Sequence, residues 1–234
     1  RFSNVSVLNY KWGFFGKGQI VNKSLNSVDV GVCFDLSPVF ASCTFNHISL
    51  TKPLSTLRNT ACCFCVSTEE KRNILQESAR IARGDVADMA KLDVSAFDAV
   101  IIPGGFGVAK NLSDWAVKNK DCTVLPQLEK IIKAFHKAGK PLGMCCISPI
   151  LAVKLLPGCE VTVGQDEECE KFPYAKTAGV LKEMGCKHVN KDVGEAHVDV
   201  KNKLVTTCAF MCNASFHQIF DGIGVLVKET LILA

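Results

Sequence analysis

The sequence lacks several features, and each absence excludes a class of protein. No run of 18 or more apolar residues occurs, whereas a membrane-spanning helix needs about 20, so we expect no membrane partner. The sequence contains no internal repeat and no low-complexity tract, which leaves an ordinary globular composition. A dinucleotide fingerprint is also missing, because Pro-Gly-Gly-Phe-Gly at residues 103–107 has neither the required spacing nor a distal ribose-binding acid. We therefore expect no cofactor.

Acidic residues are scarce in the N-terminal quarter. Residues 1–66 contain six Lys or Arg but only two acids, Asp29 and Asp35, and residues 1–28 contain no acid. A basic stretch without acids is typical of the tail of a mitochondrial transit peptide, although an irregular basic N-terminus has the same composition. Residues 67–234 contain 21 basic and 21 acidic residues, so the main body offers no positive surface for nucleic acid.

Cysteine, in contrast, is abundant, with 13 among 234 residues. The odd number and the adjacent pairs Cys62-Cys63 and Cys145-Cys146 do not fit a secreted disulfide framework, so we expect free thiols in a reducing compartment. Cys62, Cys63 and Cys65 lack the further Cys or His pair that a zinc site needs. We therefore expect no metal.

From residue 67 onwards, short apolar runs alternate with helical patterns. Ser67 and Glu70 form a capping-box pattern before an expected helix that ends near Gly84. Further strands are expected at 97–103, 141–146 and 160–163, helices at 126–139, 148–156, 175–185 and 214–233, and a hairpin at 196–207. This alternation predicts an α/β fold with a mostly parallel sheet covered on both faces. The N-terminal quarter does not fit the pattern.

Two strand ends carry residues suited to chemistry, because sites in open α/β sheets lie beyond the carboxyl ends of the strands. Gly104 and Gly105 follow the first strand, where their backbone N–H groups can approach a ligand closely. Cys146 follows the next strand, and Pro149 suits the first turn of the helix after it. The helix N-terminus favours a thiolate there, so Cys146 is the candidate nucleophile. The backbone N–H groups of Gly104, Gly105 and Ile147 are the candidate oxyanion donors. A packed structural cysteine fits the same pattern at position 146.

The sequence offers no convincing base for this thiol. His197 lies between Glu195 and Asp199, and strand alternation places all three on one face, which we interpret as the solvated edge of the hairpin. A glutaminase needs a Cys-His-Glu triad with its His and Glu two residues apart near the C-terminus. No such pair follows Cys146 in a suitable loop, so we do not expect a glutaminase.

Longer motifs are shared with a known family. The segments "PGGFGVAKNLS", "FHKAGKPLGMCCISP", "EAHVDVKNKLVTT" and "FDGIG" occur in order. From residue 67 to the C-terminus the chain closely resembles the ES-one family of mitochondrial proteins, in the ThiJ/PfpI branch of the class I glutamine amidotransferase-like superfamily. The resemblance implies a flavodoxin-like, doubly wound sheet, a mitochondrial location, and Cys146 as the nucleophile-elbow cysteine. Glyoxalase- and deglycase-like relatives imply that Cys146 attacks a small aldehyde or ketoaldehyde and forms a hemithioacetal.

The chain departs from this family pattern in three places. Residues 1–66 contain nothing that matches the family's first strand, its Ser-Gly-Cys-Gly turn or the glutamate that hydrogen-bonds the elbow cysteine, and they contain no Glu. An alternative exon, a gene-model error or real divergence would each produce this difference. Gln165 stands where relatives have a histidine, and Cys208 where they have a proline. We therefore divide the chain into a divergent, irregular segment, 1–66, and an amidotransferase-like domain, 67–234.

Two functions are compatible with these observations. The first is a binding or thiol-redox role of the Cys146 pocket with weak or no catalysis, and the missing glutamate and base favour it. The alternative is a cysteine-dependent glyoxalase- or deglycase-like enzyme that acts on small ketoaldehydes through Cys146. In both, the expected ligand is a small aldehyde or ketoaldehyde, and a homo-oligomer is compatible with either.

Overall fold

A seven-stranded sheet of order β10-β11-β7-β6-β1-β2-β5 forms the centre of the computed structural model, which describes residues 4–8, 44–49, 59–60, 67–68, 78 and 86–234. Every neighbouring pair in this sheet is parallel except the β10–β11 hairpin. The predicted α/β fold, with a mostly parallel sheet and a C-terminal hairpin, is confirmed. Its strands are β1 (Asn4–Leu8), β2 (Thr44–Ser49), β5 (Ala87–Asp88), β6 (Ala99–Ile102), β7 (Leu142–Cys145), β10 (His197–Asp199) and β11 (Leu204–Thr207).

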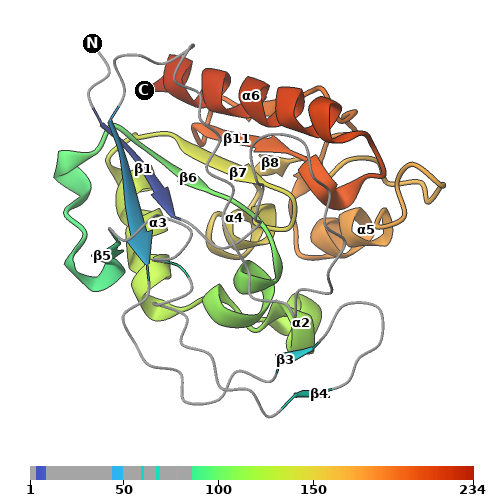
Figure 1. Ribbon diagram of the computed structural model, residues 1–234, viewed down its shortest axis with the longest axis horizontal. Helices are drawn as coiled ribbons and strands as arrows, with labels where there is room; N and C mark the ends of the chain where they lie inside the picture. The colour runs from blue at the N-terminus through green and yellow to red at the C-terminus, as the bar shows by residue number, and fades with distance from the viewer. Residues whose placement is uncertain (1–3, 9–43, 50–58, 61–66, 69–77, 79–85) are drawn as a thin grey trace.

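Helices cover both faces of this sheet (Figure 1). The long helix α6 (Phe216–Leu233) packs on one face, and α3 (Pro126–Lys137) and α4 (Pro149–Leu155) pack on the other. Successive side chains of β6 point to opposite faces of the sheet. Val100 and Ile102 pack in the core under α3 and α4, and Ala99 and Ile101 pack in the core under α6. A strand buried on both faces reads as a continuous apolar run, which is why β6 and β7 were predictable.

The helix α3 shows how its sequence sets its bounds. Pro126 occupies the first turn, where its missing N–H costs nothing. A buried stripe then follows the helical period, and the chain leaves the helix through Gly139, whose φ is +66°. This helix therefore matches the prediction. Its buried residues are Leu128, Ile131, Ile132 and Phe135.

The remaining elements are short. They comprise the helices α2 (Trp115–Lys118) and α5 (Lys176–Glu183), a π-helical turn η3 (Val108–Leu112), and the 3₁₀ turns η1 (Met89–Lys91), η2 (Val94–Ala96), η4 (Asn119–Asp121) and η5 (Ala209–Met211). Two small sheets pair β3 (Asn59–Thr60) with β4 (Ser67–Thr68), and β8 (Glu160–Val161) with β9 (Lys187–His188). No helix in the described part of the chain combines the length and the apolar character that crossing a bilayer requires.

Residues 160–163 differ from their prediction. A strand is expected over these four residues, but β8 covers only Glu160–Val161 and pairs with β9 outside the main sheet. Side chains of the hairpin explain the difference, because they accept the hydrogen bonds of this segment. The Glu160 N–H donates to Asp199 Oδ2 at 2.8 Å, and the Thr162 N–H donates to Thr206 Oγ1 at 2.9 Å.

The N-terminal quarter contributes two strands of the main sheet, β1 and β2, that the sequence pattern did not predict. The strand β1 lies between β6 and β2 and is parallel to both. The helix expected before Gly84 lies outside the described residues apart from Ser78, which is helical, and Cys62, Cys63 and Cys65 also lie outside them. The division of the chain at residue 67 stays a prediction.

Candidate functional site

The elbow at Cys146 joins β7 to α4. Cys145 is the last residue of β7, Cys146 has a φ of +60°, and α4 begins at Pro149. A positive φ is uncommon for a residue with a side chain and marks a sharp, constrained turn. The Cys146 N–H donates to the Thr207 carbonyl at 3.0 Å, so β11 holds the turn from one side. The structure therefore places Cys146 at the predicted strand-to-helix joint.

The glycine loop after β6 touches this elbow. A Cβ added to Gly104 would lie 2.5 Å from Cys146 Cβ and 2.7 Å from the Cys145 carbonyl oxygen, so no larger side chain fits without movement. The fully buried Ser148 hydroxyl lies 2.7 Å from the Ile102 carbonyl oxygen and 2.8 Å from that of Cys145, and it donates to them. Parallel neighbours β6 and β7 thus bring their loops to one edge of the sheet, as the sequence predicts.

The environment of the Cys146 thiol opposes ionisation. Burial raises its pKa to about 11, while the backbone N–H groups of Gly105, Ile147 and Phe210 act in the opposite direction. The sequence predicts a favoured thiolate at this helix N-terminus, and the structure contradicts that expectation, because loss of solvent outweighs these N–H groups. Burial likewise raises the pKa of the neighbouring Cys145 thiol, to about 12.

Most of the predicted site residues meet at this point. The N–H groups of Gly105 and Ile147 act on the Cys146 sulfur, whereas the N–H of Gly104 acts on the Cys145 sulfur. Phe210 was missed, because its N–H reaches the elbow through the turn η5, where Ala209 has a φ of +44°. Nothing in the local pattern of residues 208–212 signals that approach.

Candidate acids and bases make other contacts. His197 Nε2 lies 3.1 Å from Glu160 Oε2, and Glu160 also pairs with Lys187 at 2.7 Å. Asp199 is 4% exposed and accepts hydrogen bonds from the Glu160 N–H and from Asn202. The interpretation of the hairpin edge as solvated is therefore wrong for Asp199, which fastens β8 to the hairpin. Gln165 donates to the Lys191 carbonyl at 3.2 Å.

No carboxylate or imidazole is among the main influences on the Cys146 pKa within the described part of the chain. Across the same residues, no group of three or more His, Cys, Asp or Glu side chains is arranged to hold a metal ion. The chemistry that this site offers is therefore a half-buried thiol surrounded by backbone donors.

The site is thus a cysteine between a glycine loop and a short helix, at the edge of a mostly parallel sheet that is covered on both faces. The model of the DJ-1/PfpI family matches residues 39–216 of this sequence. The chain belongs to the DJ-1/PfpI family. The match begins inside the segment that sequence reasoning set apart as divergent.

Named relatives agree with this assignment. The chain is 57% identical over 168 residues to human "Glutamine amidotransferase-like class 1 domain-containing protein 3, mitochondrial". The aligned residues make up 71% of this chain and 63% of the human protein. It is 40% identical over 175 residues to zebrafish "ES1 protein, mitochondrial", covering 70% of this chain and 65% of that protein. The chain thus spans less than two thirds of the length of these relatives. Their names confirm the ES-one resemblance and agree with the predicted mitochondrial location.

A crystal structure from Ehrlichia chaffeensis has the same fold. It is described as an "isoprenoid biosynthesis protein with amidotransferase-like domain" and is 26% identical to this chain. The superposition has a TM-score of 0.75 and covers 99% of this chain and 100% of the other.

Proposed function

We propose that this is a mitochondrial DJ-1/PfpI protein whose Cys146 pocket has a binding or thiol-redox role with weak or no turnover. The observation that carries the proposal is the surroundings of the thiol, since no carboxylate or imidazole is among the main influences on its pKa within the described residues. Burial raises that pKa to about 11, and such a value would leave roughly one molecule in ten thousand as the thiolate at pH 7, against about one in a hundred at a pKa of 9. Since the thiolate is the nucleophile, rapid turnover at this cysteine is disfavoured.

A half-buried thiol with backbone donors suits a small carbonyl compound as a reversible ligand. The Cys146 sulfur would add to the carbonyl carbon of an aldehyde or ketoaldehyde, and the thiol proton would end on the carbonyl oxygen, which gives a hemithioacetal. We assign the N–H groups of Gly105 and Ile147 as donors to that oxygen, because both already act on the sulfur. Gly104 lets the loop after β6 lie against the Cys146 elbow, because it has no Cβ. The role of its N–H as a donor to the ligand oxygen stays a prediction.

The glyoxalase- or deglycase-like enzyme is the second candidate, and the same N–H groups favour it. Donors that hold a hemithioacetal oxygen would also stabilise negative charge developing on that oxygen during a reaction. This enzyme would need a group that removes the thiol proton, and the described residues supply none among the main influences on the Cys146 pKa. The balance therefore favours binding or redox chemistry over turnover.

Methylglyoxal consumption tests the proposal. Wild-type protein and Cys146→Ser should consume methylglyoxal at indistinguishable steady-state rates. Peptide mapping should nevertheless find a reversible adduct, or an oxidised sulfur after peroxide, on the peptide that contains Cys146 in wild type, and neither on the same peptide of Cys146→Ser. A Cys159→Ser variant is a matched control, since Cys159 is buried in the core under α3 and α4, whereas Cys146 packs against the core under α6. Sustained turnover that Cys146→Ser abolishes and Cys159→Ser retains would replace this proposal with the enzyme.

A further inference from the structure

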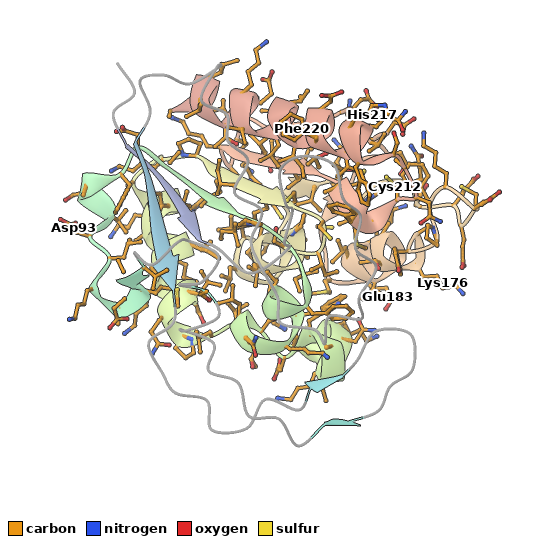
Figure 2. The ribbon with its side chains drawn as sticks, viewed as in Figure 1. Asp93, Lys176, Glu183, Cys212, His217 and Phe220 are labelled. Carbon is orange, nitrogen blue, oxygen red and sulfur yellow. The ribbon has the colours of Figure 1, made fainter. Side chains whose placement is uncertain are left out.

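A second pair of thiols lies next to the elbow. Cys208 follows β11 and Cys212 follows the turn η5, so the two residues flank a single turn. Their sulfur atoms are 3.9 Å apart, with the Cys208 thiol donating to the Cys212 sulfur. Both side chains are buried, at 0% and 4% exposure. Figure 2 shows Cys212 near the N-terminal end of α6, where His217 is labelled.

The backbone fixes this pair relative to the elbow. Thr207, the residue before Cys208, lies opposite Cys145 in the parallel β7–β11 pairing. The Met211 N–H closes the turn by donating to the Cys208 carbonyl at 2.9 Å. Phe210, at the middle of the same turn, directs its N–H to the Cys146 sulfur. The two sulfurs are therefore held close together beside the elbow, in the segment that follows β11, whereas Cys146 follows β7.

The two thiols differ in their surroundings, as the members of a redox pair do. The hydrogen bond from Cys208 and the ammonium of Lys171 lower the pKa of the Cys212 thiol. That hydrogen bond and burial raise the pKa of the Cys208 thiol. Burial opposes ionisation of Cys212, and so do Asp192, which pairs with Lys171 at 2.6 Å, and the Ala209 carbonyl, 3.2 Å from the Cys212 sulfur. Cys212 is thus the better nucleophile of the pair.

We propose that Cys208 and Cys212 form a reversible dithiol–disulfide site that small hydroperoxides oxidise. The Cys212 thiolate attacks one peroxide oxygen and the O–O bond breaks, which leaves a sulfenic acid on Cys212 and releases water, or an alcohol from an organic hydroperoxide, after protonation. The Cys208 sulfur then displaces the hydroxyl from the Cys212 sulfur, and its proton leaves in a second water. Two thiols become one disulfide, and a small thiol reductant reverses the reaction.

Two features of the site make the bond reversible and select its oxidant. The loop that it closes is one turn, so it restricts the unfolded chain less than a long loop would and adds little stability to the oxidised form. The burial of both sulfurs favours small reactants over bulky ones, both for oxidation and for reduction. This site goes beyond the role proposed for Cys146, because no step in it uses that residue.

Peptide mapping tests the proposal on the wild-type protein. Trypsin releases residues 204–228 as one peptide that contains Cys208 and Cys212 and no other cysteine. After hydrogen peroxide treatment and alkylation of the remaining thiols, this peptide should lose two hydrogens and carry no alkyl group. A thiol reductant should restore both alkylation sites. The Cys146→Ser variant should give the same result, which separates this site from the proposed function.

Three outcomes would overturn the inference. The first is a peptide that remains fully alkylatable at peroxide levels that oxidise Cys146. The second is a disulfide that links residues 204–228 to the peptide containing Cys146. The third is a disulfide that forms equally in a control with Cys212→Ser, which would show that another cysteine supplies the bond.

Discussion

Substitution of Gly104 by alanine should separate the two loops that form the site. The new Cβ would lie 2.5 Å from Cys146 Cβ, 2.7 Å from the Cys145 carbonyl oxygen and 3.0 Å from the Ile147 nitrogen. Two of these neighbours are backbone atoms in a constrained turn, so they cannot move aside as a flexible side chain would. Overpacking of this kind costs about 1–3 kcal/mol. For a chain of this size, that cost corresponds to a fall in melting temperature of ~2–12 °C.

Calorimetry and alkylation measure the two consequences of Gly104→Ala. The melting temperature should fall, and Cys146 should react faster with iodoacetamide because its cover has moved. Gly224→Ala is the matched control, since a Cβ at this position in α6 has nothing within 4 Å and alanine should stabilise the helix by about 0.5–1 kcal/mol. Wild-type stability and unchanged labelling in Gly104→Ala would refute the contact between the loops.

Three further changes have expected outcomes. Ser148→Ala should destabilise the protein by about 1–3 kcal/mol in urea unfolding, because it removes the buried hydroxyl that donates to the Ile102 and Cys145 carbonyls. The exposed Ser95→Ala should have a smaller effect, and equal effects would show that the Ser148 hydroxyl does not link the two loops. Brief iodoacetamide treatment should label Cys146 before Cys145, which is 7% exposed and has a pKa of about 12, and the reverse order would place the elbow one residue earlier. Asp114→Asn should lower the melting temperature at pH 7, because Lys118 and Thr123 hold the pKa of that carboxyl at about 2. That stabilisation is present above the ordinary carboxyl pKa near 4 and is lost as the pH falls towards 2, so a difference that persists at pH 2 would contradict the assignment.

The positions of strands and helices could be predicted where the local residue pattern matches the burial of the element. The strands β6 and β7 are continuous apolar runs because both of their faces are covered, and Pro149 located the start of α4 and hence the elbow. The strand β1, "NVSVL", is a five-residue segment with polar residues at positions 4 and 6, so its place in the sheet was not evident from its composition.

Contacts between distant segments account for what the sequence could not predict. The four residues 160–163 have a strand pattern, but side chains of the hairpin take their hydrogen bonds. Ser148 bonds to a carbonyl 46 residues earlier, and the Phe210 N–H reaches Cys146 from another strand. The helix N-terminus suggested a favoured thiolate, but the extent of desolvation depends on the packed structure and outweighs it.

The pKa of the Cys146 thiol is the most direct test of the proposal that its pocket binds or senses without rapid turnover. Short pulses of iodoacetamide at a series of pH values between 7 and about 12, with peptide mapping of each sample, would report the thiolate fraction at this residue. Because the alkylation rate follows that fraction, we expect it to rise about tenfold per pH unit towards a midpoint near 11. A midpoint below the ordinary cysteine value of 9.0 would show an activated nucleophile and contradict the account.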